Sequence, residues 1–274
     1  MNILINLIRL NVEYFTKLTI DCIDNAKYAI LPGDPKRAKE LALCIDPNAT
    51  KLKENRQHAS YLAYLEGTPI LVISTGMGCP AIHAITVELS RLGLQYLIRI
   101  GTCGAIKPNI NLGDIIFTKS AVKLDGVSKQ YIDVAYPAIA SHSLTQSFVR
   151  AAKDHDVPHH IGITATSDTF WPGQERLDNF SGYLLRNLQG AMKEWQAINV
   201  SNFEMEASAL LTAAHILEIK AACFCGVLAK RVENEEVSMD AKEIAKRNWE
   251  TILKPGLLND IKRRAQEVTK HESR

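Results

Sequence analysis

The sequence predicts a single α/β domain, built as a three-layer α/β/α sandwich around a mixed central β-sheet. Short apolar segments with strand-like composition alternate with segments of helical periodicity along most of the 274 residues. No Pro/Gly/Ser-rich linker and no low-complexity segment divides the chain. We therefore expect one domain over residues 1–274, with residues 1–13 as an N-terminal extension.

Apolar runs bounded by turn residues are the expected strands. They occupy 28–31, 61–65, 70–74, 96–100, 114–124, 161–166 and 221–228. The expected helices repeat their apolar residues at three- and four-residue spacing, as Ile82, Ile85 and Leu89 do. They occupy 35–45, 80–92, 144–152, 206–219 and 240–270. In a sheet of this kind, functional loops lie at the ends of the strands.

Composition narrows the classes of function. The chain is 46% apolar and 23% charged, as soluble globular proteins are, and its net charge of +2 indicates no nucleic-acid partner. It nowhere contains the roughly 18 unbroken apolar residues of a membrane span. Polar residues interrupt the apolar stretch 1–14 and no small-residue cleavage site follows, so we expect no signal peptide. These features predict a cytoplasmic protein that binds no membrane.

The six cysteines are scattered, unlike those of a small disulfide-bonded secreted domain. Cys223 and Cys225 form a C-x-C pair, which is half of some metal sites. They lie in the apolar run 221–228, where alternate residues share one face, so we expect both thiols to pack in the core. The sequence predicts no metal and no organic cofactor.

Glycine-containing turns are predicted after three of the strands, at 32–35, 74–78 and 101–104. Such turns let backbone N–H groups approach an anion, although most are only connections. Arg99 favours the interpretation that these turns bind an anion. An arginine in an apolar strand needs a buried carboxylate or a bound anion as its counter-charge. Its planar guanidinium suits phosphate, and Arg37 suits the same role. No triphosphate or dinucleotide loop motif occurs.

Two further segments concentrate side chains that suit a nucleoside. Residues 167–176 combine two aromatic rings with Gln174 and Arg176, which suits stacking on a flat heterocycle and recognition of its polar edge. Residues 202–206 place one carboxylate on each side of Met205, at the start of a predicted helix. A carboxylate in the first turn of a helix interacts favourably with the helix dipole. This explains the presence of one glutamate better than the presence of two.

Together these motifs resemble the nucleoside phosphorylase-I family, and within it the enzymes that act on pyrimidine nucleosides. The resemblance runs nearly collinearly from about Tyr14 to the C-terminal helix. It is carried by Pro32-Gly33-Asp34-Pro35-x-Arg37, Arg99-Ile100-Gly101-Thr102, Asp168-Thr169-Phe170-x-Pro172-Gly173-Gln174-Glu175-Arg176 and Glu204-Met205-Glu206. It implies a phosphorylase-like sandwich and a pentosyltransferase that converts uridine reversibly to uracil and ribose 1-phosphate, a step of pyrimidine nucleoside salvage.

Matched residue by residue, the resemblance assigns roles to positions of this sequence. The phosphate site matches Gly33, Arg37, Arg56, Arg99 and Thr102. The ribose site matches Thr102, Met205 and Glu206. The base site matches Phe170, Gln174, Arg176 and Arg231, the last in a predicted loop after the final core strand. Catalysis is expected to rest on Arg99, Gln174, Arg176 and Glu206.

The resemblance also implies partners and a mechanism. Arg56 matches an arginine that reaches across from a neighbouring subunit, so a complete site is expected only in a dimer, and the dimers are expected to form a hexamer. The small-molecule partners are uridine and inorganic phosphate, which is a co-substrate. Gln174 and Arg176 are expected to stabilise negative charge on the departing uracil. Glu206 is expected to hold the ribose while phosphate attacks the opposite face of its anomeric carbon.

The chain departs from the family pattern at two sites. The histidine that contacts the ribose 5′-hydroxyl falls at Phe15, which cannot make that hydrogen bond, and Tyr14 is the nearby group that can replace it. The carboxylate and the hydroxyl of a monovalent-cation site fall at Gln57 and Ala81. We therefore expect no bound potassium.

Other functions remain open on these residues. A purine nucleoside phosphorylase of this family carries an acidic residue after the last core strand, where this chain has Ala229-Lys230-Arg231. A hydrolytic nucleosidase dispenses with the phosphate arginines, which this chain keeps. A non-catalytic nucleoside-binding protein on the same scaffold has no need of both the phosphate and the base residues.

Overall fold

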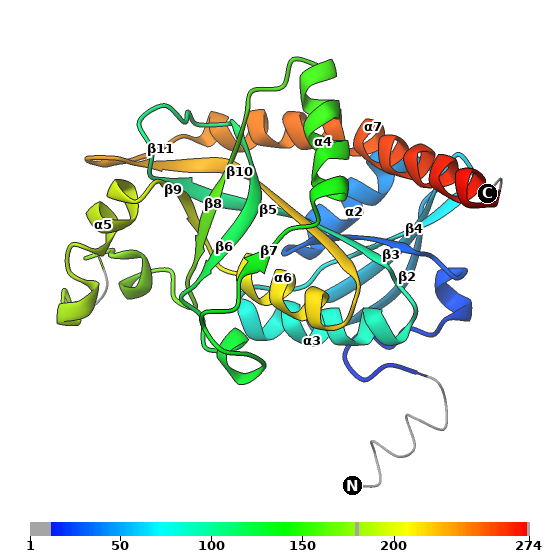
Figure 1. The fold of residues 1–274 in the computed structure, drawn as a ribbon, viewed down its shortest axis with the longest axis horizontal. Coiled ribbons are helices and arrows are strands. Elements are labelled where there is room, and N and C mark those ends of the chain that lie inside the picture. Colours follow the sequence, from blue (N-terminus) through cyan, green and yellow to red (C-terminus); the bar gives the residue numbers. More distant parts are fainter. Residues whose placement is uncertain (1–11, 179–180, 273–274) are drawn as a thin grey trace, which may run out of the picture.

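The computed structural model describes residues 12–178 and 181–272, which form one β-sheet covered by helices (Figure 1). The strands are β1 (Tyr28–Pro32), β2 (Thr50–Asn55), β3 (His58–Leu65), β4 (Thr68–Ile73), β5 (Tyr96–Ala105), β6 (Ile115–Lys123), β7 (Ala138–Ile139), β8 (His159–Thr166), β9 (Val200–Glu204), β10 (Lys220–Arg231) and β11 (Glu235–Val237). The α-helices are α2 (Pro35–Ile45), α3 (Cys79–Arg91), α4 (His142–Asp154), α5 (Ala191–Ala197), α6 (Ala207–Ile216) and α7 (Met239–Glu272). Single turns of 3-10 helix are η1 (Asp21–Ile23), η2 (Ser128–Gln130), η3 (Pro172–Gln174) and η4 (Arg186–Leu188).

The sheet is mixed, as predicted. Its strand order is β11-β10-β6-β8-β9-β5-β1-β4-β3-β2, with β7 paired to β6. β1 is parallel to β4 and β5, whereas β3 is antiparallel to both of its neighbours. A further parallel pairing joins β5 to β10 and closes β5, β10, β6, β8 and β9 into a ring. The sequence does not predict this ring, because a pairing between strands so distant in the chain leaves no local pattern.

Helices cover both faces of the sheet (Figure 1). On one face, α2, α4 and α7 contribute Leu41, Phe148 and Trp249 to a shared apolar cluster. On the other face, α3 and α6 contribute Ile85 and Leu210 to a second cluster. These two helical layers around the sheet confirm the predicted α/β/α sandwich.

Two predicted boundaries are wrong. The sequence predicts a turn at 101–104, whereas these residues belong to β5, and it predicts Arg231 in a loop, whereas this residue ends β10. Both strands continue because they pair with each other as far as Ala105 and Lys230. Gly101 is required by a close approach and not by a turn. A Cβ atom there would lie 2.9 Å from both Arg99 Nη2 and Cys225 Sγ.

Some predictions concern parts of the chain beyond the described residues. The N-terminal extension, 1–13, and the apolar stretch considered for a signal peptide fall mostly on residues 1–11, which lie outside them. The single-domain organisation of 1–274 stays a prediction. Among the described residues, no helix combines the length and the apolar character needed to cross a bilayer.

The topology brings the functional segments to one end of the sheet. β1, β5 and β10 run parallel to one another, so their carboxyl ends lie together. The loop that begins α2 follows β1, and the turn that begins α6 follows β9. The segment after β8 reaches the hairpin between β10 and β11, where Arg176 and Arg231 both donate to Glu235.

Candidate active site

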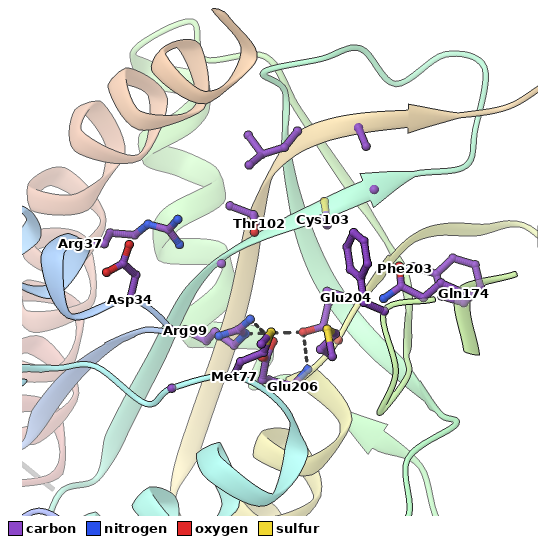
Figure 2. A pocket seen from close by; sticks show the side chains of 18 of the residues that line it. Asp34, Arg37, Met77, Arg99, Thr102, Cys103, Gln174, Phe203, Glu204 and Glu206 are labelled. Atoms are coloured by element: carbon purple, nitrogen blue, oxygen red, sulfur yellow. Dashed lines mark hydrogen bonds and ion pairs between the residues drawn. The ribbon is translucent and has the colours of Figure 1, made fainter. Parts of the chain in front are cut away.

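A cavity of about 590 Å³ opens at this end of the sheet (Figure 2). Its volume lies in the range of small-molecule sites. Every predicted site residue lines it except Arg56 and Arg231. Those that line it are Gly33, Arg37, Arg99, Thr102, Phe170, Gln174, Arg176, Met205 and Glu206. Residues from widely separated parts of the sequence are therefore brought together as predicted, while their individual roles stay predictions.

Arg99 is the buried charge at the centre of the cavity. It projects from β5, and only 4% of its surface is exposed. Its Nη2 contacts the carboxylate of Glu206, and its Nε lies 3.5 Å from Glu204 Oε2. Its Nη1 is buried and has no hydrogen-bond partner among the described residues. The structure thus supplies the buried carboxylate that the sequence allows as a counter-charge, and it leaves one N–H donor of Arg99 unsatisfied.

Arg37 approaches Arg99 from the first turn of α2 (Figure 2). Its guanidinium lies over the ring of Trp249 at 4.7 Å from the ring centre, which orients it. Burial lowers the pKa of Arg37, and the positive charge of Arg99 lowers it further. Two guanidiniums that repel each other beside a cavity are suited to hold an anion between them.

Two carboxylates lie beside this cationic end, and they differ in role. Glu204 Oε1 accepts a hydrogen bond from Thr166 at 2.5 Å, and Oε2 accepts from the backbone N–H groups of Glu206 and Ala207 at 2.8 Å each. Burial raises the pKa of Glu204, the nearby Glu206 charge adds to this rise, and Arg99 opposes it. Glu204 is therefore committed to holding the first turn of α6 in place.

Glu206 is the second of these carboxylates, and like Arg99 it is buried. Its Oε1 accepts from the backbone N–H of Gly78 at 2.6 Å, and its other oxygen contacts Arg99. Met77, which is 75% exposed, lies near it in Figure 2. Glu206 thereby joins the glycine loop after β4 to β5, and it presents an acceptor next to the cationic end.

The opposite end of the cavity is formed by the segment after β8. Arg176 Nη1 donates to Gln174 Oε1 at 2.7 Å and to the carbonyl oxygen of Phe170 at 2.9 Å. The Arg176 guanidinium also stacks on the Phe170 ring, 3.8 Å from its centre. Gln174 and Arg176 are buried, whereas Phe170 is 43% exposed. The predicted base-binding residues thus form one packed unit.

Arg231 supports this unit from behind. Its Nη2 donates to the backbone carbonyl of Gln174 at 2.8 Å, so it braces the wall without lining the cavity. Glu235, which does line the cavity, contacts both Arg176 and Arg231. Sequence reasoning missed Glu235. Its four-residue spacing from Arg231 is the available signal, but that spacing indicates a contact only once the hairpin is known.

Arg56 lies at the tip of the hairpin between β2 and β3, with a φ of 56°. Its guanidinium lies 5.7 Å from the centre of the Phe15 ring and 5.9 Å from that of Tyr14. The next residue, Gln57, lines the cavity of the same chain, whereas Arg56 does not. Arg56 is therefore separated from the other predicted phosphate ligands within one chain.

The C-x-C pair lies on β10, opposite Arg99 and Gly101 of the neighbouring strand β5. Cys223 and Cys225 are fully buried and belong to an apolar cluster with Val227. Their sulfur atoms lie within 4.8 Å of a carboxylate oxygen of Glu204, an arrangement that is geometrically able to hold a metal. The hydrogen bonds of Glu204 and the adjacent Arg99 charge disfavour a cation there, so we keep the prediction that both thiols pack in the core.

Comparison with known proteins identifies the family. The model of the phosphorylase superfamily matches residues 27–254. The chain belongs to this superfamily. It is 42% identical to the uridine phosphorylase of Haemophilus influenzae over 81% of this chain and 88% of that protein. It is 42% identical to the uridine phosphorylase of Escherichia coli over 80% of this chain and 86% of that protein.

A third relative is nearly as similar. The chain is 40% identical to the uridine phosphorylase of Thermococcus kodakarensis, over 81% of this chain and 79% of that protein. The resemblance drawn from the sequence motifs is thereby confirmed.

Proposed function

We propose that this chain catalyses the reversible phosphorolysis of uridine to uracil and ribose 1-phosphate, in pyrimidine nucleoside salvage. One observation carries the proposal. A single cavity joins the two guanidiniums of Arg37 and Arg99 to the Gln174–Arg176 pair, with the carboxylate of Glu206 between them. Relatives that are 40% to 42% identical over most of the chain are uridine phosphorylases.

The proposed mechanism follows from the distribution of charge. Phosphate binds at the cationic end, where Arg37 and Arg99 line the cavity and Arg99 Nη1 has no hydrogen-bond partner among the described residues. Glu206 accepts hydrogen bonds from the ribose hydroxyls, and uracil lies against Gln174, Arg176 and Phe170. As the glycosidic bond breaks, negative charge grows on uracil and positive charge grows on ribose. Arg176 stabilises the negative charge on uracil through preorganised N–H donors. Bound phosphate attacks the anomeric carbon of the positively charged ribose.

The remaining parts of the proposal concern cofactors, assembly and location. Phosphate itself is the nucleophile, so the proposed mechanism uses no protein nucleophile, and it invokes no metal and no organic cofactor. Arg56 lies outside the cavity of its own chain, which supports a site completed by a partner subunit in a dimer. We extend the proposal to a hexamer of three dimers and to a cytoplasmic location.

Phosphate-dependent release of uracil tests this function against its rivals. The purified protein is supplied with uridine, adenosine or guanosine, each with and without phosphate, and the free base is quantified. We expect rapid release from uridine only when phosphate is present. Release without phosphate would indicate a hydrolytic nucleosidase, release from purine nucleosides a purine enzyme, and binding without release a non-catalytic nucleoside-binding protein.

A further inference from the structure

Two buried arginines share one carboxylate at the base end of the cavity. Glu235 Oε1 accepts from Arg176 Nη2 at 2.8 Å, and Oε2 accepts from Arg176 Nε at 3.1 Å. Oε2 also accepts from Arg231 Nε at 3.1 Å. The side chains of Arg176 and Arg231 are 5% and 6% exposed, and that of Glu235 is 34% exposed. The carboxylate therefore lies at the boundary between the buried arginines and solvent.

The paired contact sets the orientation of the Arg176 guanidinium. A carboxylate that accepts from two N–H groups of one guanidinium fixes its plane as well as its position. With Nε and Nη2 directed to Glu235, Nη1 is directed to Gln174 Oε1. Arg231 acts on the same wall, because it binds Glu235 through Nε and the Gln174 carbonyl through Nη2. Glu235 thus holds both residues assigned to the base.

Glu235 also changes the electrostatics of the base end of the cavity. Burial lowers the pKa of Arg231, and the neighbouring Arg176 charge lowers it further. Burial alone would raise the pKa of Glu235, but the two arginines outweigh it and hold that pKa below its usual value. Glu235 is therefore ionised at neutral pH, and it balances one of the two positive charges at the base end.

The short strand β11 places Glu235 at the cavity and Glu236 outside it. β11 is antiparallel to β10, with Glu235 opposite Arg231 and Glu236 opposite Lys230. Glu235 lines the cavity, whereas Glu236 is exposed and does not line it. Two adjacent residues of the same type thus occupy one exposed strand, and only one of them contacts the base-end arginines.

We propose that Glu235 is a positioning residue for nucleoside binding, which orients Arg176 and sets the charge of the base end. This inference rests on the proposed function, in which Gln174 and Arg176 bind uracil. Among the described residues, the hydrogen bonds and ion pairs of Glu235 go to Arg176 and Arg231, and none joins it to Arg37 or Arg99. Loss of its carboxylate therefore weakens uridine binding and leaves phosphate binding unchanged.

Steady-state kinetics of three variants test the proposal. Glu235→Gln keeps the shape of the side chain but removes its charge, Glu235→Asp keeps the charge, and Glu236→Gln is the matched control. We expect Glu235→Gln to lower kcat/KM for uridine by about tenfold or more, the effect of losing a charge-assisted hydrogen bond at a binding residue. The KM for uridine should rise, the KM for phosphate should not change, and Glu235→Asp should recover part of the loss.

The possible outcomes separate this inference from the proposed function. Wild-type uridine kinetics in Glu235→Gln, or an equal loss of uridine and phosphate affinity, would overturn the positioning role. If the wild-type protein releases no uracil from uridine, the proposed function fails, and uracil binding measured by calorimetry then decides the inference. In that measurement Glu235→Gln is expected to bind uracil more weakly than Glu236→Gln, and equal binding or no binding by any variant would overturn it.

Discussion

Arg99 and Glu206, which are 107 residues apart in the sequence, form a buried ion pair at the centre of the cavity. The pair links the residue assigned to phosphate with the residue assigned to ribose. Arg99 lines the cavity, and its buried Nη1 has no hydrogen-bond partner among the described residues while its Nη2 contacts Glu206. In the proposed reaction, phosphate and ribose bind on the two sides of this ion pair.

Phosphate should stabilise the folded protein through this cationic end. A ligand present at 100 times its Kd adds about 2.7 kcal/mol to the free energy of unfolding. We expect phosphate to raise the Tm of the wild-type protein and Arg37→Ala to abolish most of that increase. Lys39→Ala, an exposed change on the same helix, is the control and should keep the increase. An undiminished effect of phosphate on Arg37→Ala would remove Arg37 from the anion site.

Arg176→Ala should lower turnover of uridine severely without unfolding the protein. Loss of one preorganised donor to developing negative charge typically costs on the order of 100-fold or more in rate. Steady-state kinetics measure this loss, and circular dichroism checks the fold. Arg186→Ala, at an exposed position in η4, is the control and should behave as wild type. A folded Arg176→Ala enzyme with nearly wild-type kcat/KM would exclude Arg176 from the site.

Sites shared between subunits should allow two inactive variants to complement each other. Co-expressed Arg56→Ala and Arg176→Ala chains form mixed dimers in which one of the two sites keeps both arginines, so we expect activity to recover. Arg37→Ala mixed with Arg176→Ala is the control, because both residues line the cavity of one chain and no native site forms. Failure of the first mixture to recover, or an active monomer in sedimentation, would contradict the shared site.

Potassium should have no specific effect on this protein. A monovalent cation held between subunits needs oxygen ligands with a carboxylate to balance its charge, and the two matching positions here are Gln57 and Ala81. Without a negative charge, the desolvation of the ion is poorly compensated. We expect equal activity and equal Tm in potassium and in a bulky organic cation at the same ionic strength. A potassium-specific rise in Tm would show that other oxygens form the site.

The fold was predictable where burial leaves a local pattern. The core strands β1 and β10 are nearly continuous apolar runs, and α3 repeats its apolar residues at helical spacing. β2, with the sequence Thr-Lys-Leu-Lys-Glu-Asn, is mostly exposed and carries no such pattern. The pairing of β5 with β10 depends on tertiary contacts, which is why the glycines at 101–104 resemble a turn in the sequence although they lie within a strand.

The candidate site was predictable where a residue type is unusual for its position in the sequence. Arg99 in an apolar strand and the Gln174–Arg176 pair both line the cavity as the sequence predicts. Glu235 was not predictable, because a glutamate in a polar, exposed hairpin is ordinary until the fold places it against two buried arginines. Arg231 was predicted to bind the nucleobase, whereas in the structure it contacts the backbone of Gln174 behind the cavity wall.

The central claim is that one cavity holds phosphate and a pyrimidine nucleoside and transfers ribose between them. Phosphorus-31 NMR of the wild-type protein with uridine and phosphate tests it most directly, together with quantification of uracil in the same sample. We expect ribose 1-phosphate and uracil in equal amounts, and none of either product from the Arg99→Ala variant. Uracil released without an equal amount of ribose 1-phosphate, or no uracil released by the wild-type protein, would contradict this proposal.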